Sequence, residues 1–414
     1  MRARMSRDDW PPQTFTAQLR GTPAGLTPPE RAQRSVAHEG SLAYRLTKAV
    51  SHVPLIGPRL GAPPPSDWLP DQEVERITAA PLYRRIEALR SSRAYRRLWR
   101  RGGGRAGTVA ADGREISSRH VDEALAFLKT VPFQELQRRG WHLQPNHYYW
   151  PLNDVEFLRA HPELWHDRGL PAGIDWDLDG QLAFARELAA HYSELADVAA
   201  RPGSVDMSSE ITFVNGAFPH ADACAYYGIV RMRQPRRVVE IGSGWSTIFL
   251  AHALAGNERP SDVTLIEPEP DRRLLARIPR GWDVQRSLLQ FADLSVFEAL
   301  GPGDVCFYDG SHVARTGSDV NWFFFEVLPR LKAGVMVHVH DIYWPDDYHD
   351  QWIYGDGLSW NEQYVLQAFL MHNDAYRVRL ANHLLFRTRE ADVRKIYPTW
   401  PDGGSVWLEK VRGS

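Results

Sequence analysis

Cysteine, lysine and long apolar runs are scarce in this chain of 414 residues. Cys224 and Cys306 are its only cysteines, too few for a disulfide framework or a zinc knuckle, and this favours a reducing, cytoplasmic location. No apolar run reaches the ~18 residues of a transmembrane helix, and the basic first residues lead into no stretch typical of a secretory signal. Lysine supplies only 5 of the 49 basic residues, a bias that indicates a GC-rich genome rather than a function.

The formal net charge of −2 conceals an uneven distribution of charged residues. Residues 1–105 carry a net charge of +10 and the remainder one of −12, so we expect the two parts to have different roles. We interpret residues 1–117 as a basic, Arg- and Pro-rich, partly disordered region with an amphipathic helix near 71–101. Its stretch 82–101 is expected to touch the inner face of an anionic membrane or a partner helix, with a solvated helix as the alternative. No nucleic-acid-binding module is recognisable, and the sequence leaves the oligomeric state open.

The rest of the chain divides into two predicted parts. Residues 118–215 hold an amphipathic helix at 181–199 and aromatic, Pro-broken loops, and we expect them to form a cap that contributes to the substrate site. In residues 216–414, apolar strands alternate with helices, a pattern that predicts a Rossmann-like α/β fold with a seven-stranded, mostly parallel sheet covered on both faces. The predicted strands are 236–242, 262–268, 282–287, 304–310, 334–341 and, as an antiparallel pair at the sheet edge, 376–387 and 405–411.

A Gly-rich turn, VVEIGSGWS at residues 238–246, lies between the first predicted strand and a helix. Gly242 and Gly244 allow a sharp turn and a close approach of the backbone to a ligand. Thr247 stands where a dinucleotide-binding motif has its third glycine, and Glu240 suits a cationic amino group better than a pyrophosphate. The turn therefore favours the methionine end of S-adenosylmethionine, with a nicotinamide dinucleotide as the alternative.

Acidic residues and histidines follow the other strands at the same edge of the predicted sheet. Glu267 ends the second strand, where a carboxylate accepts both ribose hydroxyls of a nucleoside. Asp309 and His312, in YDGSH, are candidates for orienter and general base. His340 and Asp341 end the fifth strand and, with Asp309, could hold Mg²⁺, Mn²⁺ or Fe²⁺, although a metal-free role in binding substrate or loop backbone is equally open.

An aromatic and polar run comes directly after the fifth strand, where it can form a wall of the substrate site. Aromatic faces flanked by carboxylates and amides suit sugars or aromatic polyols, while core packing is the alternative for part of them. The residues that we predict to contact substrate are Tyr343, Trp344, Trp360, Asn361 and Glu362.

The motifs EIGSGWST, IEP, DGSHVARTGSDVNWFFFEVLPRLKAGVMVHVHDI and WNEQYVLQAFL resemble those of the bacterial class I S-adenosylmethionine-dependent methyltransferases, in the branch grouped as methyltransferase family 24. The resemblance spans about residues 138–390. It implies that Glu240, Gly242 and Gly244 hold the methionine and ribose parts of the cofactor, and Glu267 the ribose hydroxyls. The full set predicted to bind the cofactor is Glu240, Gly242, Ser243, Gly244, Ser246, Glu267 and Asp309.

A more distant resemblance is to the macrocin and mycinamicin type of sugar O-methyltransferases, which have an Asp-x-x-His motif after the fourth strand. Asp309 and His312 match that motif, so the resemblance implies that Asp309 binds Mg²⁺ and His312 is the base. In those enzymes the fifth strand ends in two aspartates, whereas this chain has His340 and Asp341.

We therefore expect methyl transfer from S-adenosylmethionine to an oxygen of a small molecule, sugar or glycan. Three alternatives remain from the sequence: a nitrogen or carbon acceptor, a non-catalytic protein that binds S-adenosylmethionine, and an NAD-dependent oxidoreductase.

Overall fold

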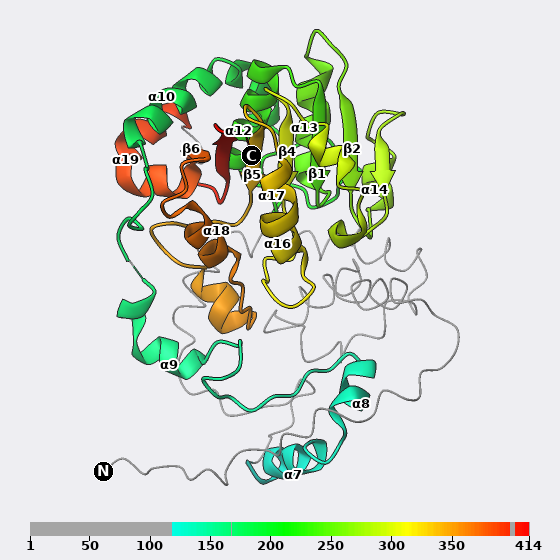
Figure 1. The fold of residues 1–414 in the computed structure, drawn as a ribbon, viewed down its shortest axis with the longest axis vertical. Coiled ribbons are helices and arrows are strands. Elements are labelled where there is room, and N and C mark those ends of the chain that lie inside the picture. The colour runs from blue at the N-terminus through cyan, green and yellow to red at the C-terminus, as the bar shows by residue number, and fades with distance from the viewer. Residues whose placement is uncertain (1–117, 167, 398–401, 414) are drawn as a thin grey trace.

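The computed structural model describes residues 118–166, 168–397 and 402–413 (Figure 1). The helix predicted near 71–101 and the rest of the basic region, residues 1–117, lie outside these described residues. Among the residues that are described, no helix has both the length and the apolar character needed to cross a membrane.

In the described part of the chain, seven strands form one sheet with the order β3-β2-β1-β4-β5-β7-β6, which confirms the predicted α/β fold. Strands β1 to β5 pair in parallel, whereas β7 is antiparallel to both β5 and β6, so the antiparallel pair at the edge is confirmed. The strands are β1 (Arg237–Ile241), β2 (Asp262–Ile266), β3 (Asp283–Gln285), β4 (Val305–Tyr308), β5 (Met336–Val339), β6 (Tyr376–Ala381) and β7 (Val406–Lys410).

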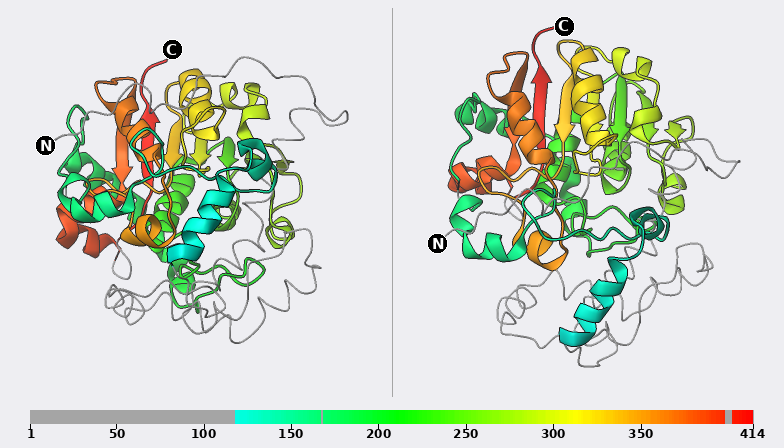
Figure 2. Two further views of the ribbon diagram at one scale, coloured as in Figure 1. Left: turned by 90° about the horizontal axis from the view of Figure 1, so that it is seen from below. Right: turned by 60° about the horizontal axis from the view of Figure 1, so that its bottom comes forward.

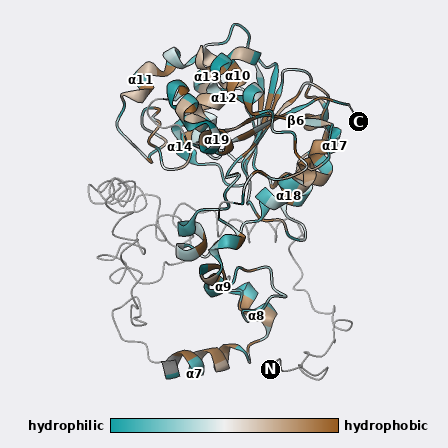
Figure 3. Cartoon of the chain, turned by 90° about the vertical axis from the view of Figure 1, so that its left-hand side faces the viewer, coloured by the Kyte–Doolittle hydropathy of each residue, from teal (hydrophilic) through white to brown (hydrophobic). Residues whose placement is uncertain are grey.

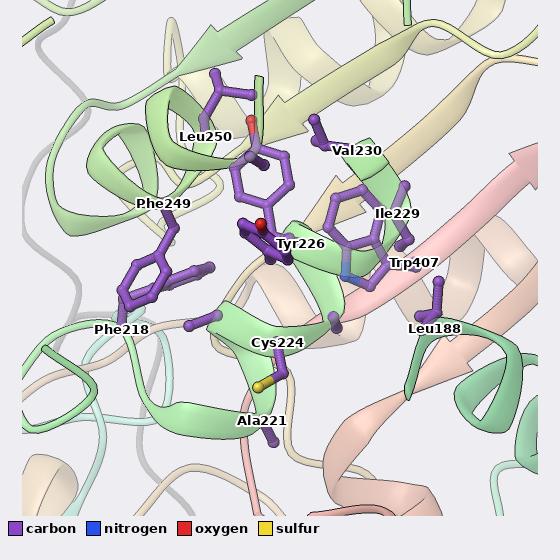
Figure 4. Packing of buried hydrophobic residues seen from close by; sticks show 14 of the residues in the cluster. Leu188, Phe218, Ala221, Cys224, Tyr226, Ile229, Val230, Phe249, Leu250 and Trp407 are labelled. Atoms are coloured by element: carbon purple, nitrogen blue, oxygen red, sulfur yellow. The ribbon is translucent and has the colours of Figure 1, made fainter. Parts of the chain in front are cut away.

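Helices cover both faces of the sheet, because its central strands are apolar on both sides (Figures 1 and 2). Val238 and Val239, neighbours in β1, point to opposite faces and lie in two different hydrophobic clusters. In one cluster, Tyr226 packs with Phe249 and Trp407 (Figure 4). The covering helices include α12 (His220–Arg233), α13 (Trp245–Ala255), α14 (Arg272–Leu275), α15 (Ser295–Glu298), α16 (Asp319–Trp322), the π-helical segment η5 (Phe323–Val327), α17 (Leu328–Arg330), α18 (Glu362–Leu370) and α19 (Asn382–Ile396), and α10 (Leu178–Ala189) packs against β6.

Two predicted elements differ from the structure. The helix predicted at 181–199 is broken into α10 (Leu178–Ala189), the 3₁₀ turn η3 (Tyr192–Leu195) and α11 (Ala196–Ala199). The turn directs Glu194 towards α12, where its carboxylate accepts hydrogen bonds from Tyr227 and Arg231.

The strand predicted at 376–387 was too long, since β6 ends at Ala381 and α19 begins at Asn382. The amide of Asn382 donates to the buried carboxylate of Asp222, and Leu384 and Leu385 are buried as the first turns of the helix. Long-range contacts with α12 therefore fix this boundary, and they leave no signal in the local pattern.

The predicted cap begins with four short helices, which Figures 1 and 3 place apart from the sheet. They are α7 (Ser118–Leu128), α8 (Phe133–Arg138), α9 (Val155–Ala160) and η2 (Pro162–Leu164). Asn153, just before α9, donates from its backbone to the Ser359 hydroxyl and from its side chain to the Leu358 carbonyl. Trp165 packs with Tyr348 in the loop after β5. This part of the cap is thus attached to the segment that was predicted to form the substrate wall.

Candidate functional site

The Gly-rich turn joins β1 to the N-terminus of α13. Gly242 has a φ of +81°, and a Cβ at this position would collide with the carbonyl oxygen of Asp309. Only glycine fits there, because both the left-handed backbone and the approach of the β4 end exclude a side chain. Gly244 has a φ of −176°, an extended conformation, and open space around its Cβ position. The turn thus brings the ends of β1 and β4 together.

Glu240 lies completely buried beneath this turn. Its carboxylate accepts hydrogen bonds from the hydroxyls of Ser246 at 2.8 Å, Thr247 at 2.7 Å and Tyr226 at 3.0 Å. Burial outweighs these three hydrogen bonds and raises the pKa of Glu240 to about 7. Both carboxylate oxygens accept hydrogen bonds from within the fold, so Glu240 and Ser246 support the start of α13 in this structure, and their contact with a cofactor stays a prediction.

Glu267 follows β2 and lies beside the turn, as predicted for a ribose-binding carboxylate. One of its oxygens accepts from the backbone N–H of Ser243 at 3.1 Å, and the other from that of Glu269 at 2.9 Å. The hydroxyl of Ser243 is buried and, within the described residues, makes no hydrogen bond. A buried polar group without a partner is costly, so a ligand atom that bonds the Ser243 hydroxyl would be favoured.

The imidazole of His312 lies at the centre of three carboxylates from three segments. Its Nδ1 is 2.8 Å from Oε2 of Glu362, at the start of α18. Its Nε2 is 3.4 Å from Oδ1 of Asp309, after β4, and 3.5 Å from Oδ2 of Asp341, after β5. The ring of Trp360 covers the imidazole at a centroid distance of 4.3 Å. The predicted Asp309, His312 and Asp341 are therefore brought together, and Glu362 joins them.

Two residues of this centre have a strained backbone. His312 has a φ of +59° and Asp341 a φ of +57°, a region that non-glycine residues enter at a cost of about 1–3 kcal/mol each. The carbonyl of His312 accepts hydrogen bonds from the backbone N–H groups of Asn361 and Glu362, and the Tyr343 hydroxyl donates to Asp341 at 2.9 Å. The surrounding structure thus holds both residues in conformations that turn their side chains towards each other.

The close contacts in this centre shift the pKa values of His312 and Asp309 in opposite directions. Burial disfavours a charged imidazole, but hydrogen bonds to Asp309 and Glu362 outweigh it and raise the pKa of His312 well above its ordinary value. Burial likewise opposes ionisation of Asp309, but the charges of His340 and His312 lower its pKa well below the usual range. With a carboxylate facing each ring nitrogen, His312 needs either a second proton or a cation at Nε2.

The group that could hold a metal ion differs from the predicted one. Asp309, His312 and Asp341 each offer one ligand atom, and these atoms lie within 4.8 Å of one another. The predicted His340 is not in this group: its Nε2 lies 3.7 Å from Oδ1 of Asp341, but its side chain is buried and its ring packs 5.3 Å from that of Phe218. Because strand residues alternate between faces, His340 shares with His338 the side of β5 that faces α12, and His312 takes its place as the nitrogen ligand.

The predicted substrate residues are distributed over three kinds of position. The ring of Trp360 packs against His312 at an interplanar angle of 41°, and the Tyr343 hydroxyl donates to Asp341, so both border the centre. The Asn361 side chain accepts from the backbone N–H of Ala314 at 2.6 Å and so fixes the loop after β4. Trp344 is a correction: it is 2% exposed and packs edge-on against Trp176 in the core, so it presents no face to a substrate.

Two residues that support the site were not among the predicted site residues. Tyr226, on α12, bonds Glu240, and Gln363, on α18, accepts from the backbone N–H of Tyr343 at 2.6 Å. Tyr226 belongs to no motif. Gln363 lies in the motif WNEQYVLQAFL, directly after the predicted Glu362, and this position is the signal that could have drawn attention to it.

Comparison with known proteins gives the family. A protein-family model described as a methyltransferase domain matches residues 239–342, from β1 through the loop that carries Asp341. An uncharacterised protein of Archaeoglobus fulgidus is 30% identical over 167 residues, which cover 38% of this chain and 72% of that relative. The chain belongs to this methyltransferase family. The resemblance to the class I methyltransferases that the motifs indicated is thereby confirmed.

Solved structures of methyltransferases also overlap with this one. The methyltransferase PaMTH1 of Podospora anserina, bound to SAH, is 13% identical, with coverage of 65% of this chain and 99% of that one and a TM-score of 0.31. An O-methyltransferase from Bacillus cereus in complex with SAH is 16% identical, with coverage of 55% and 99% and a TM-score of 0.31. At these scores the similarity adds nothing to the family assignment.

Proposed function

We propose that this methyltransferase transfers a methyl group from S-adenosylmethionine to a hydroxyl oxygen of a small-molecule or glycan acceptor. One observation carries the proposal: the imidazole of His312 faces Asp309 and Asp341 at the carboxyl ends of β4 and β5, beside the Gly-rich turn after β1. Ligands of open α/β sheets bind at this edge, where neighbouring parallel strands end together.

The cofactor is proposed to lie along the ends of β1 and β2. Gly244 leaves the backbone open to it, Gly242 permits the turn, and the hydroxyl of Ser243 gains a partner. Glu267 is then placed to accept the ribose hydroxyls, while Glu240 keeps α13 in position from below. The N-terminus of the 11-residue helix α13 supplies free N–H groups to the carboxylate of the methionine part.

The sulfonium of S-adenosylmethionine supplies an already activated methyl group, so the protein has two tasks. It aligns the acceptor oxygen with the methyl group, an effect that contributes several kcal/mol in well-oriented reactions. It also removes the hydroxyl proton. In its neutral form, which is the minor form below its raised pKa, His312 takes this proton at Nε2, while Glu362 accepts from Nδ1–H and so fixes the orientation of the ring. Asp309 and Asp341 stabilise the imidazolium that forms.

The same residues fit a divalent cation. The group combines two carboxylates with an imidazole whose Nδ1 is occupied by Glu362, so Nε2 is left as a ligand atom. A nitrogen among oxygen ligands favours Mn²⁺ or Fe²⁺ over Mg²⁺. A cation held by Asp309, His312 and Asp341 would polarise the acceptor hydroxyl and favour its ionised form.

The acceptor is proposed to rest on the aromatic residues of the loop after β5. The ring centroid of Trp360 lies 4.8 Å from that of Trp352 and 5.8 Å from that of Tyr348. Trp360 in turn contacts His312, so this aromatic group lies next to the reacting centre. Aromatic faces next to carboxylates suit the ring of a sugar or of an aromatic diol. The hydroxyl of Tyr343 and the indole of Trp360 are the predicted contacts nearest to the reacting oxygen.

Purified protein with tritiated S-adenosylmethionine and a panel of catechols, hexoses and deoxy sugars tests the proposal. We expect methylated product from at least one of these acceptors, and loss of that product in both His312→Ala and Asp309→Ala. Turnover that is unchanged in both variants would overturn the proposed chemistry. A pH–rate profile that is flat between about pH 6 and 9 would favour a nitrogen acceptor, which needs no base.

A further inference from the structure

The loop at residues 341–348, which follows β5, determines where Asp341 lies. The Asp341 carboxylate faces His312 Nε2 at 3.5 Å with one oxygen, and with the other it accepts from the Tyr343 hydroxyl at 2.9 Å. Whatever fixes Tyr343 and the rest of this loop therefore also fixes one side of the reacting centre.

Two attachments of this loop use neutral hydrogen bonds. The side chain of Gln363 accepts from the Tyr343 N–H at 2.6 Å and donates to the Asp346 carbonyl at 2.9 Å. The N–H of Ile342 donates to the Gly404 carbonyl at 2.9 Å, in the segment that leads into β7. The loop is thus held between α18 on one side and residues 402–405 on the other.

A third attachment is ionic and passes through His383, near the start of α19. Its Nε2 lies 3.0 Å from Oδ2 of Asp346 in the loop, and its Nδ1 lies 2.7 Å from Oδ1 of Asp402 in the segment before β7. The ring also packs edge-on against Tyr343, with 5.4 Å between the centroids. One side chain therefore bridges the loop and the segment that flank Tyr343.

An imidazole with a carboxylate at each nitrogen donates two hydrogen bonds only when it is positively charged. Burial disfavours this charge, but hydrogen bonds to Asp346 and Asp402 outweigh it and raise the pKa of His383 to about 9. Two other titratable or charged side chains lie nearby. Arg387, on the same helix, pairs with Asp346 at 3.0 Å, and the ring of His349 packs against that of Tyr343 at a centroid distance of 4.3 Å. Above this pKa the neutral imidazole of His383 keeps only one N–H. Its other nitrogen then presents a lone pair to one of the two carboxylates, so that hydrogen bond is lost and the bridge is broken.

We propose that His383 is a positioning residue for methyl transfer: by bridging Asp346 and Asp402, it holds the loop that sets Tyr343 and Asp341 against His312. Its effect on turnover rests on the proposed function, whereas the bridge itself does not. Cofactor affinity is expected to be independent of His383, because the Gly-rich turn and Glu267 belong to β1 and β2.

Two substitutions separate the bridge from general packing. His383→Gln leaves one amide, which can donate to only one of the two carboxylates, so the bridge is lost at every pH. Asp402→Asn supplies an amide that donates to the neutral imidazole, whose other nitrogen still donates to Asp346. This variant should keep the bridge at alkaline pH. His191→Gln is the matched control, since His191 pairs with Glu194 on η3, on another part of the molecule.

Amide hydrogen exchange of residues 341–348, measured by mass spectrometry and corrected for intrinsic rates, tests the bridge without any acceptor. In the unchanged protein, protection of the loop should fall as the pH rises through about 9. It should already be low at pH 7.5 in His383→Gln, and it should persist above pH 9 in Asp402→Asn. Loop protection in His383→Gln equal to that in His191→Gln would overturn the proposal.

Turnover with an acceptor from the panel above then tests positioning. At pH 7.5, kcat of His383→Gln should fall about tenfold to a hundredfold, the scale of a misplacement near 1 Å, with the Kd for S-adenosylmethionine unchanged. In the unchanged protein, kcat should fall as the pH rises through about 9, because the bridge is lost there. This alkaline loss of kcat should disappear in Asp402→Asn. A Kd that weakens as much as kcat falls, or an unchanged kcat, would overturn the positioning role. If the unchanged protein methylates no acceptor, the proposed function fails, while the exchange result still decides whether the bridge exists.

Discussion

Nδ1 of His312 lies 2.8 Å from Oε2 of Glu362, although the two residues are 50 positions apart in the chain. The contact joins the loop after β4 to the first turn of α18, and it directs the other ring nitrogen towards Asp309 and Asp341. The Glu362 side chain is only 1% exposed, and its pKa is raised to about 7, because burial outweighs the hydrogen bond from His312. The orientation of the base thus depends on a carboxylate that is withdrawn from solvent.

Glu362→Gln is expected to lower kcat while leaving cofactor binding intact. The amide oxygen can still accept from Nδ1–H, but the negative charge that stabilises the imidazolium is gone, so we expect a loss of about tenfold to a hundredfold. Steady-state kinetics together with calorimetry of S-adenosylmethionine binding measure both quantities. Glu326→Gln, at an exposed pair with Arg330, is the control. Equal kcat in the two variants would contradict the role of Glu362.

Gly242→Ala and Gly244→Ala are expected to behave differently, although the two glycines are neighbours in one turn. At Gly242 a methyl group would collide with the Asp309 carbonyl and require a positive φ, so this variant should lose stability and cofactor binding. At Gly244 the backbone is extended and the space is open, so the melting temperature should be unchanged. Any loss of affinity in Gly244→Ala would then report a contact with the cofactor. Thermal unfolding and calorimetry distinguish the two cases, and equal melting temperatures would contradict this description of the turn.

Divalent cation binding is expected to follow His312 rather than His340. Electron paramagnetic resonance of Mn²⁺ measures free and bound cation without any need for turnover. Asp341→Asn and His312→Gln should each weaken Mn²⁺ binding about tenfold or more, because each removes one ligand of the group Asp309, His312 and Asp341. His340→Gln should bind Mn²⁺ as the unchanged protein does. If His340→Gln weakened Mn²⁺ binding and His312→Gln did not, the ligand set predicted from the sequence, Asp309, His340 and Asp341, would be the correct one.

Glu194 is expected to stabilise the fold at neutral pH and not in acid. Burial opposes its ionisation, but Arg231, His191 and Tyr227 outweigh it and lower the pKa of Glu194 from 4.5 to about 2. A lowered carboxyl pKa stabilises the folded state above pH 4.5, and this contribution is lost as the pH falls from 4.5 towards 2. Because the side chain is 34% exposed, solvent screening limits the effect of Glu194→Gln to about 1 kcal/mol.

Urea unfolding of Glu194→Gln at several pH values measures this contribution. The difference from the unchanged protein should be present at pH 7 and vanish near pH 2. Glu187→Gln, on the exposed side of α10, should show no such dependence. A difference that stays constant from pH 7 to pH 2 would show that charge is not its cause.

The sheet could be predicted because its strands carry a local signal. Short apolar runs such as residues 304–310 are bounded by turn residues, and their alternation with helices implies a parallel sheet. The edge at which Gly242, Glu267, Asp309 and Asp341 gather follows from that topology. The end of β6 at Ala381 did not follow, because a buried hydrogen bond from Asn382 to Asp222, 160 positions away, determines it.

The composition of the centre could be predicted only in part. Asp309 and His312 lie in one short motif, but the carboxylate of Glu362 reaches His312 from a different helix, and no spacing rule connects them. His340 looked equivalent to a ligand because it precedes Asp341 in the sequence, and its Nε2 does lie 3.7 Å from Oδ1 of Asp341, but the compact group of ligand atoms contains His312 in its place. Trp344 was placed among substrate contacts by its neighbours, whereas packing against Trp176 puts it in the core.

Calorimetric titration of the purified protein with S-adenosylmethionine, before and after treatment with a chelator, shows directly whether this chain binds the cofactor. We expect binding of one cofactor per chain that survives removal of metal, because the Gly-rich turn and Glu267 lie apart from the group that could hold a cation. No binding under either condition, in a sample whose folding is verified by circular dichroism, would contradict the assignment of this site to methyl transfer.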